Sequence, residues 1–139
     1  MIEKIRDCFG FADSDPGQLS PLTLAFIGDS IYGAVAKTFV VLSGNCSPNS
    51  LDAKAVNIVK AVSQAKVADH LIDKELLTEE ELTIYKRGRN SKSQSVAKNA
   101  PVGDYRKATG LEALVGWLYL SGDMDRVLEI MKTAVEVCG

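Results

Sequence analysis

Apolar residues recur along the chain at spacings of three and four, and clusters of polar residues interrupt them at intervals. This spacing is typical of helices that bury one face, and no segment alternates convincingly with the period of two that a half-buried strand requires. The pattern predicts an all-α fold of five to seven helices in a single domain over residues 1–139. The expected helices cover residues 2–9, 21–42, 51–73, 78–87, 104–121 and 123–137.

Capping and turn residues set the expected boundaries of these helices. Ser20 and Pro21 have the residue types preferred at the N-cap and first helical position. Thr78 followed three residues later by Glu81 has the pattern of a capping box. Gly88 is expected to end its helix, because residues 88–103 are rich in Gly, Asn and Ser and read as a loop.

The two most apolar segments each contain a lone carboxylate. Asp29 and Lys37 are the only charged residues in 21–42, and Glu112 is the only one in 108–121. Both acids are expected to lie among buried apolar side chains, where an unpaired carboxylate costs several kcal/mol. A shared Mg²⁺ would compensate, because this cation takes one or two carboxylates together with waters and phosphate oxygens. Alternatively, each acid lies at the rim of the core or bonds a nearby hydroxyl.

Glycines flank both acids. Gly28 and Gly33 lie near Asp29, and Gly110 and Gly116 lie near Glu112. Glycine inside a helix costs about 0.5–1 kcal/mol relative to alanine. Four such residues in two helices therefore indicate a close approach of helix to helix, or of helix to ligand.

Composition excludes several kinds of site. The single histidine, His70, rules out a two-histidine acid–base nuclease and a zinc site with two histidines from one chain. Three cysteines without a C-x-x-C pair argue against a disulfide framework and favour a reducing cytosol. The charged N-terminus argues against a signal peptide, and Asp29 and Lys37 argue against a membrane span. We therefore expect a cytoplasmic protein.

The net charge of −2 hides an uneven distribution. Residues 86–107 contain seven basic residues and one acid, so the rest of the chain carries a net charge of −8. Within this segment, side chains that suit phosphate contacts are Lys86, Arg87, Arg89, Asn90, Lys92 and Lys98. Residues 86–99 contain no aromatic side chain, which favours contact with a duplex backbone over stacking on single strands. A solvated loop is the alternative interpretation.

Three motifs in this chain resemble ribonuclease III domains. LTLAFIGDS (residues 22–30) resembles the signature helix of that family. KRGRNSK (86–92) and YRKATGLEALVGWLYL (105–120) are similar to the Mini-ribonuclease III branch, the compact bacterial group without a double-stranded-RNA-binding domain. The resemblance covers nearly the whole chain, and no second RNA-binding domain is expected after residue 138.

This resemblance implies an all-helical endonuclease that works as a two-fold homodimer and cleaves double-stranded RNA, with a role in maturing the 23S ribosomal RNA precursor. It implies that Asp29 and Glu112 bind Mg²⁺, with Mn²⁺ as a substitute. Metal-assisted hydrolysis would leave 5′-phosphate and 3′-hydroxyl ends, and residues 86–98 would contact the RNA. The larger enzymes have acids where this chain has Leu22, Ala25 and Thr109, so its acidic set is reduced.

Two other functions are compatible with the same residues. A non-catalytic RNA-binding or ribosome-associated protein on this fold would account for the missing acids at three positions, although retention of Asp29 and Glu112 favours the nuclease. An all-α interaction protein, in which both acids are structural, is the remaining alternative.

Overall fold

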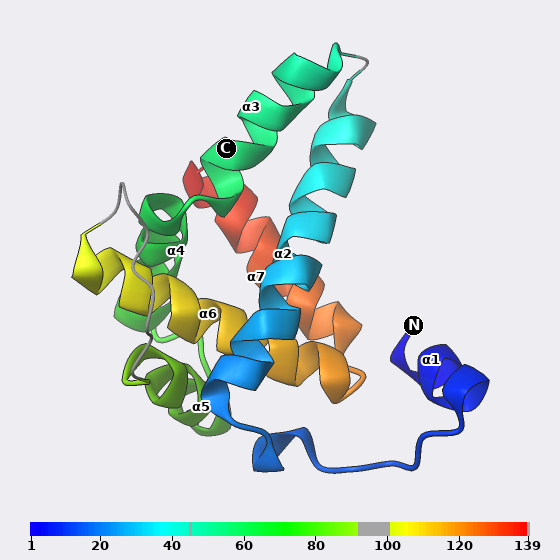
Figure 1. Cartoon of the computed structure of the whole chain (residues 1–139). Helices are drawn as coiled ribbons and strands as arrows, with labels where there is room; N and C mark the ends of the chain where they lie inside the picture. The colour runs from blue at the N-terminus through cyan, green and yellow to red at the C-terminus, as the bar shows by residue number, and fades with distance from the viewer. Residues whose placement is uncertain (45, 92–100, 139) are drawn as a thin grey trace.

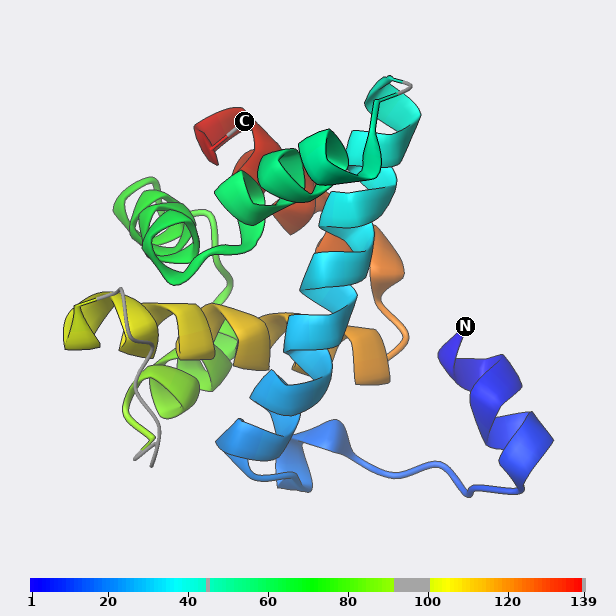
Figure 2. The ribbon, with the colours of Figure 1, turned by 45° about the horizontal axis from the view of Figure 1, so that its top comes forward.

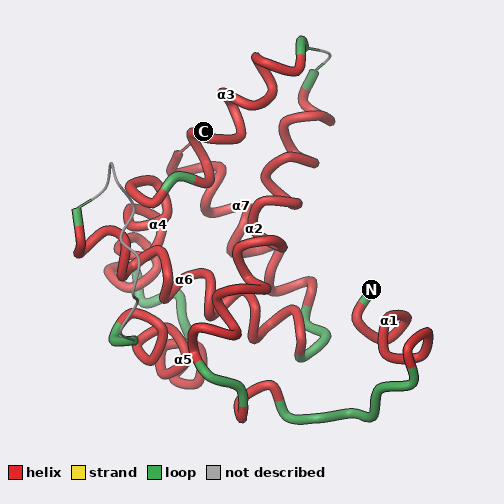
Figure 3. The backbone as a smooth tube through the Cα atoms, in the orientation of Figure 1, coloured by secondary structure: helices red, strands yellow, loops and turns green. Residues whose placement is uncertain are grey.

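The helical spacing of apolar residues produces seven α-helices in the computed structural model, which describes residues 1–44, 46–91 and 101–138 (Figures 1 and 3). A 3-10 turn, η1 (Pro16–Gln18), precedes the second helix. No strand occurs in these ranges, which confirms the predicted all-α fold. The helices are α1 (Ile2–Phe9), α2 (Pro21–Ser43), α3 (Pro48–Val59), α4 (Ala61–Asp73), α5 (Glu79–Arg89), α6 (Val102–Leu120) and α7 (Met124–Cys138).

The predicted caps are confirmed. The Ser20 hydroxyl accepts a hydrogen bond from the Thr23 backbone N–H at 3.2 Å, and Pro21 is the first residue of α2. At the start of α5, the Thr78 side chain accepts from the Glu81 N–H, and the Glu81 carboxylate accepts from the Thr78 N–H. These reciprocal bonds satisfy amide groups that a helix N-terminus otherwise leaves unpaired.

Helix α6 lies at the centre of the molecule. Helices α2, α4, α5 and α7 all pack against it, and α2 crosses it (Figure 2). Helix α3 packs on α2, and α1 lies to one side, where the Arg6 guanidinium donates to the Leu120 carbonyl at 3.1 Å. Each of the central helices therefore presents residues to α6 from a different direction.

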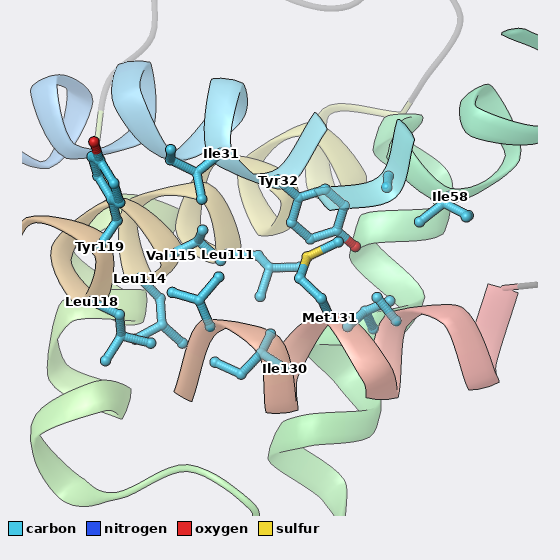
Figure 4. Close-up of a cluster of buried hydrophobic side chains, with 14 of the residues drawn as sticks. Ile31, Tyr32, Ile58, Leu111, Leu114, Val115, Leu118, Tyr119, Ile130 and Met131 are labelled. Carbon is cyan, nitrogen blue, oxygen red and sulfur yellow. The ribbon is translucent and has the colours of Figure 1, made fainter. Parts of the chain in front are cut away.

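The main hydrophobic core forms between α2, α6 and α7 (Figure 4). Its large, fully buried side chains include Tyr32, Leu111, Leu114, Ile130 and Met131. Helix α2 is long and apolar enough to cross a membrane by length and composition alone. In the structure this helix packs against α6 and contributes to the hydrophobic core.

The prediction of one helix over residues 51–73 is wrong. The helix is interrupted at Lys60, whose extended backbone (φ −63°, ψ 153°) separates α3 from α4. Two side chains that follow the break stabilise it: Ser63 Oγ donates to the Asn57 carbonyl at 2.6 Å, and Gln64 Nε2 donates to the Val59 carbonyl at 2.8 Å. These bonds satisfy carbonyls that the end of α3 would otherwise leave free.

Gly88 does not end its helix, contrary to prediction. Helix α5 continues to Arg89 because Gly88 is a packing residue: a Cβ atom there would lie 2.8 Å from the Cβ of Ala113 and 2.9 Å from the Cα of Gly110. The absent side chain lets α5 approach α6 closely. The predicted loop over 88–103 is correspondingly shorter, and residues 92–100 lie outside the described part of the chain.

Sequence reasoning also missed a buried ion pair between α5 and α7. Glu81 is only 4% exposed, and both of its carboxylate oxygens accept from Arg126, at 2.8 and 2.9 Å. Burial raises the pKa of Glu81, but hydrogen bonds from Arg126 and Thr78 outweigh it, so the pKa lies below its ordinary value. Glu81 thus caps one helix and joins it to another.

Candidate active site

A glycine contact between α2 and α6 brings the two lone acids together. A Cβ atom at Gly28 would overlap the backbone carbonyl of Glu112, and one at Gly116 would overlap that of Leu24. The two backbones therefore touch directly where the helices cross. Asp29 and Glu112 lie beside this contact, so the predicted close approach of the helices is confirmed for Gly28 and Gly116. Gly110 meets Tyr85 of α5 in the same way, whereas Gly33 has open space around it.

Both acids line one cleft of about 550 Å³ between α2, α6 and the corner that joins α3 to α4. Other polar side chains in its lining belong to Gln64, Tyr105 and Thr109. Leu22, Ala25 and Phe26 form an apolar wall on α2. The structure thus brings together the two candidate ligands that the sequence had separated by 83 positions.

The environment of Glu112 disfavours its ionised form. Burial, followed by a hydrogen bond with Asp29 and repulsion from its charge, raises the pKa of Glu112 to about 9; a hydrogen bond from Gln64 acts in the opposite direction. Two neighbouring carboxylates cannot both be ionised cheaply without a compensating charge. A bound cation would supply that charge.

The expectation that both acids are buried holds in part. Glu112 is half-buried, but Asp29 is exposed. Asp29 lies at the open side of the cleft, where Phe26, three residues earlier on the same helix, is also 79% exposed. Asp29 is therefore open to solvent and to ligands from outside.

The donor set suits a hard divalent cation. Carboxylate and amide oxygens are the ligands that Mg²⁺ accepts, and its remaining positions are usually filled by water and substrate phosphate. Within the described ranges, no group of three or more His, Cys, Asp or Glu side chains could hold a metal. The larger enzymes of the resembled family have an acid at the position of Thr109. Here the Thr109 hydroxyl donates a hydrogen bond to the Tyr105 carbonyl at 3.0 Å. Asp29 and Glu112 thus remain the two carboxylates of the cleft.

Gln64 is a cleft residue that sequence reasoning missed. It is only 3% exposed, although it is polar. One signal was available: Gln64, Ala68 and Leu71 follow the spacing of a single helix face, and the other two are buried apolar residues. A polar residue on an apolar helix face is a candidate for a functional role, as Asp29 and Glu112 are.

The predicted RNA-contacting residues that the structure describes lie at the end of α5. The side chains of Lys86, Arg87 and Asn90 are exposed. Arg89 lies over the ring of Tyr85, with its Cζ atom 5.8 Å from the ring centroid, and its Nε donates to Asn90 Oδ1 at 3.2 Å. Lys92 and Lys98 lie outside the described residues.

Helix packing places this basic end of α5 near the cleft. Gly88 lies between the basic residues Arg87 and Arg89. A Cβ atom at Gly88 would lie 3.2 Å from the backbone carbonyl oxygen of Thr109. Thr109 lines the cleft that contains Asp29 and Glu112. The end of α5 is therefore packed against the segment of α6 that carries Thr109 and Glu112.

Comparisons with known proteins agree with this arrangement. The ribonuclease III domain matches residues 22–123. Mini-ribonuclease 3 of Brevibacillus brevis is 46% identical over 123 residues, which cover 88% of this chain and 90% of the relative. Mini-ribonuclease 3 of Enterococcus faecalis is 42% identical over 125 residues, covering 90% and 95%. A crystal structure of a Fusobacterium nucleatum protein matches with a TM-score of 0.78 at 27% identity, covering 89% of this chain and 98% of that one.

Proposed function

The chain belongs to the ribonuclease III domain family and is an endoribonuclease similar to Mini-ribonuclease 3, and we propose that it hydrolyses double-stranded RNA with a divalent cation held by Asp29 and Glu112. The observation that carries this proposal is the meeting of these two carboxylates in one cleft, where α2 crosses α6. Mg²⁺ is the proposed cation, and Mn²⁺ has the same preference for oxygen ligands.

Asp29 and Glu112 have distinct parts in the proposed reaction. When bound, the cation supplies Lewis-acid stabilisation of the phosphate and a water of lowered pKa. Asp29 would hold the cation at the exposed edge of the cleft, which an RNA phosphate can reach. Glu112 presents its carboxyl from a half-buried position, where a positive charge would favour its ionised form. Attack of water on the phosphorus, with departure of the 3′ oxygen, leaves 5′-phosphate and 3′-hydroxyl ends.

The basic end of α5 binds the RNA in this proposal. Positive charge and hydrogen-bond donors for the phosphates come from Lys86, Arg87, Arg89, Asn90, Lys92 and Lys98. Duplex RNA has the A-form shape and 2′-hydroxyl groups that such a sequence-tolerant surface recognises. The proposed natural substrate is a precursor of the 23S ribosomal RNA, which places the protein in the cytoplasm.

The active form in this proposal is a two-fold homodimer. Its support is the exposure of apolar side chains at both ends of α2, with Leu22 and Phe26 near its start and Val41 and Leu42 near its end. Exposed apolar side chains gathered on one helix are typical of an interaction surface. A second copy would cover them, and the two resulting centres would cleave both strands of one duplex.

The Asp29→Asn variant tests the function directly. We expect it to fold and assemble as the wild type does, because Asp29 is exposed, and to lose at least about 100-fold in cleavage rate, or ~2.7 kcal/mol of transition-state stabilisation. End-labelled duplex RNA would be incubated with Mg²⁺ or with EDTA. Asp13→Asn, which changes a fully exposed acid outside the cleft, is the control.

The outcome separates the nuclease from its main alternative. Cleavage that needs Mg²⁺ and disappears in Asp29→Asn supports the proposal. Salt-sensitive binding of duplex RNA without cleavage under any condition would instead indicate a non-catalytic RNA-binding protein.

A further inference from the structure

Gln64 is a buried amide side chain in the wall of the catalytic cleft. It lies in the first turns of α4, is 3% exposed, and lines the same cavity as Asp29 and Glu112. Burying an amide costs free energy unless its donors and acceptor find partners. The partners that Gln64 has, and the one that it lacks, therefore indicate what this side chain does.

The nitrogen of the Gln64 amide has two acceptors. Nε2 donates to the Val59 carbonyl at 2.8 Å. The Glu112 carboxyl, which lines the same cleft, is the second acceptor. Because both neighbours of Nε2 are acceptors, the opposite amide orientation would set Oε1 against a carbonyl and a carboxylate. The orientation of the amide is therefore determined.

The oxygen of the same amide has no partner. Gln64 Oε1 is fully buried, and no hydrogen bond reaches it from any described residue. A buried acceptor without a donor is uncommon in folded proteins and calls for an explanation. The amide is therefore held in place by the bonds of its nitrogen alone, one of which reaches a side chain of the cleft.

We propose that Gln64 is a positioning residue for Glu112: its Nε2 donates to the Glu112 carboxylate and holds it toward Asp29. This inference rests on the function proposed above and adds a third side chain to the site. Partners of this kind orient metal ligands, and their loss typically weakens metal affinity or activity about 10- to 100-fold.

A purely structural role is the competing explanation, because the bond to the Val59 carbonyl also stabilises the corner between α3 and α4. Ser63 offers a matched control. It is 5% exposed, follows the same corner, and donates to the Asn57 carbonyl at 2.6 Å, but it does not line the cleft. Ser63→Ala therefore weakens the corner without removing a group from the site.

The experiment compares the full-length wild type with Gln64→Met and Ser63→Ala. Methionine keeps the volume of glutamine but removes its donors and acceptor. Three quantities are measured: the melting temperature in EDTA, the affinity of the RNA-free protein for Mn²⁺ from the electron paramagnetic resonance signal of the unbound ion, and the Mg²⁺ concentration for half-maximal cleavage of duplex RNA. Gln64→Asn, whose shorter side chain withdraws the amide from Glu112, replaces Gln64→Met if that variant does not fold.

Both Gln64→Met and Ser63→Ala are expected to lower the melting temperature. Only Gln64→Met should weaken Mn²⁺ binding and raise the half-maximal Mg²⁺ concentration, each by about 10-fold. Cation dependence in Gln64→Met equal to that in Ser63→Ala would overturn the inference and leave Gln64 as part of the corner alone.

The Mn²⁺ measurement keeps this inference separate from the proposed function. If the wild type binds Mn²⁺ but cleaves no duplex, the proposed function fails, and weaker Mn²⁺ binding by Gln64→Met still supports the role of Gln64. If the wild type neither binds Mn²⁺ nor cleaves, both proposals are wrong.

Discussion

Glu112 is held in a half-buried position beside a second carboxylate, and this arrangement costs stability in the cation-free protein. Burial and the neighbouring Asp29 raise the pKa of Glu112 to about 9, whereas its ordinary value is 4.5. A folded protein retains such a costly group when the group has a function that a neutral residue cannot perform. A cation that binds both carboxylates removes the repulsion.

This shift predicts how stability depends on pH. Below pH 4.5 Glu112 is protonated in both the folded and the unfolded chain. Between about pH 4.5 and 9 the unfolded chain loses this proton first, so the contribution of Glu112 to stability falls as pH rises. We expect Glu112→Gln, in EDTA at pH 8, to raise the free energy of unfolding by about 1–3 kcal/mol.

Urea unfolding at pH 5 and pH 8, in EDTA, measures this effect. The wild type should lose more stability between these two pH values than Glu112→Gln does. Glu80→Gln, which changes an exposed acid, should follow the wild type. Equal pH dependence in the wild type and Glu112→Gln would show that Glu112 titrates normally in the folded protein.

At the scale of the elements, the crossing of α2 and α6 decides whether a site exists. The two helices touch through Gly28 and Gly116, and the acids lie beside this contact. Any added atom at the contact must separate the backbones, because a Cβ cannot rotate away as the end of a long side chain can. Helix separation would also move Asp29 away from Glu112.

Gly28→Ala should therefore destabilise the protein despite the better helix propensity of alanine. Overpacking typically costs about 1–3 kcal/mol, and the propensity gain is at most about 1 kcal/mol. We expect a net loss of about 2 kcal/mol in chemical denaturation and a larger loss in cleavage rate. Gly103→Ala in α6 is the control, because a Cβ there meets nothing within 4 Å, so it should not destabilise the protein and should gain at most about 1 kcal/mol from helix propensity. Unchanged stability in Gly28→Ala would show that the helices separate freely.

At the scale of the whole molecule, charge is concentrated in one segment. Residues 86–107 carry a net charge of +6, while the rest of the chain carries −8. A polyanion is therefore attracted to the end of α5 and repelled by most of the remaining surface. Affinity for duplex RNA should fall steeply as salt concentration rises.

The double variant Arg87→Ala, Arg89→Ala tests this distribution. We expect about 10-fold weaker binding of duplex RNA and a shallower salt dependence, with the cleavage rate at saturating RNA retained. A filter-binding titration over several salt concentrations measures both. Lys74→Ala, Lys132→Ala also removes two positive charges, at exposed positions outside the 86–107 segment, and should bind as the wild type does. Identical binding by the two double variants would contradict the assignment of the α5 surface.

The exposed apolar side chains near the start of α2 predict assembly at the same scale. Phe26 is 79% exposed and lies next to the cleft. We expect Phe26→Asp to convert a dimer to a monomer in sedimentation velocity, because a carboxylate cannot be buried cheaply in an apolar interface. Leu76→Asp changes an exposed apolar residue in the connection between α4 and α5, and should leave the dimer intact. A Phe26→Asp variant that sediments as the wild type does would place any interface elsewhere.

The sequence by itself determined the helical class, the N-terminal caps of α2 and α5, the two lone carboxylates and the basic segment. These features depend on the types and spacing of residues that are close together in the sequence. Only the tertiary structure decided the break at Lys60, the helical continuation through Gly88, the exposure of Asp29 and the placement of Gln64 beside Glu112. The break, the continuation of α5 and the placement of Gln64 depend on contacts between helices, and the exposure of Asp29 depends on how the helices are arranged. Local propensity carries no information about such contacts.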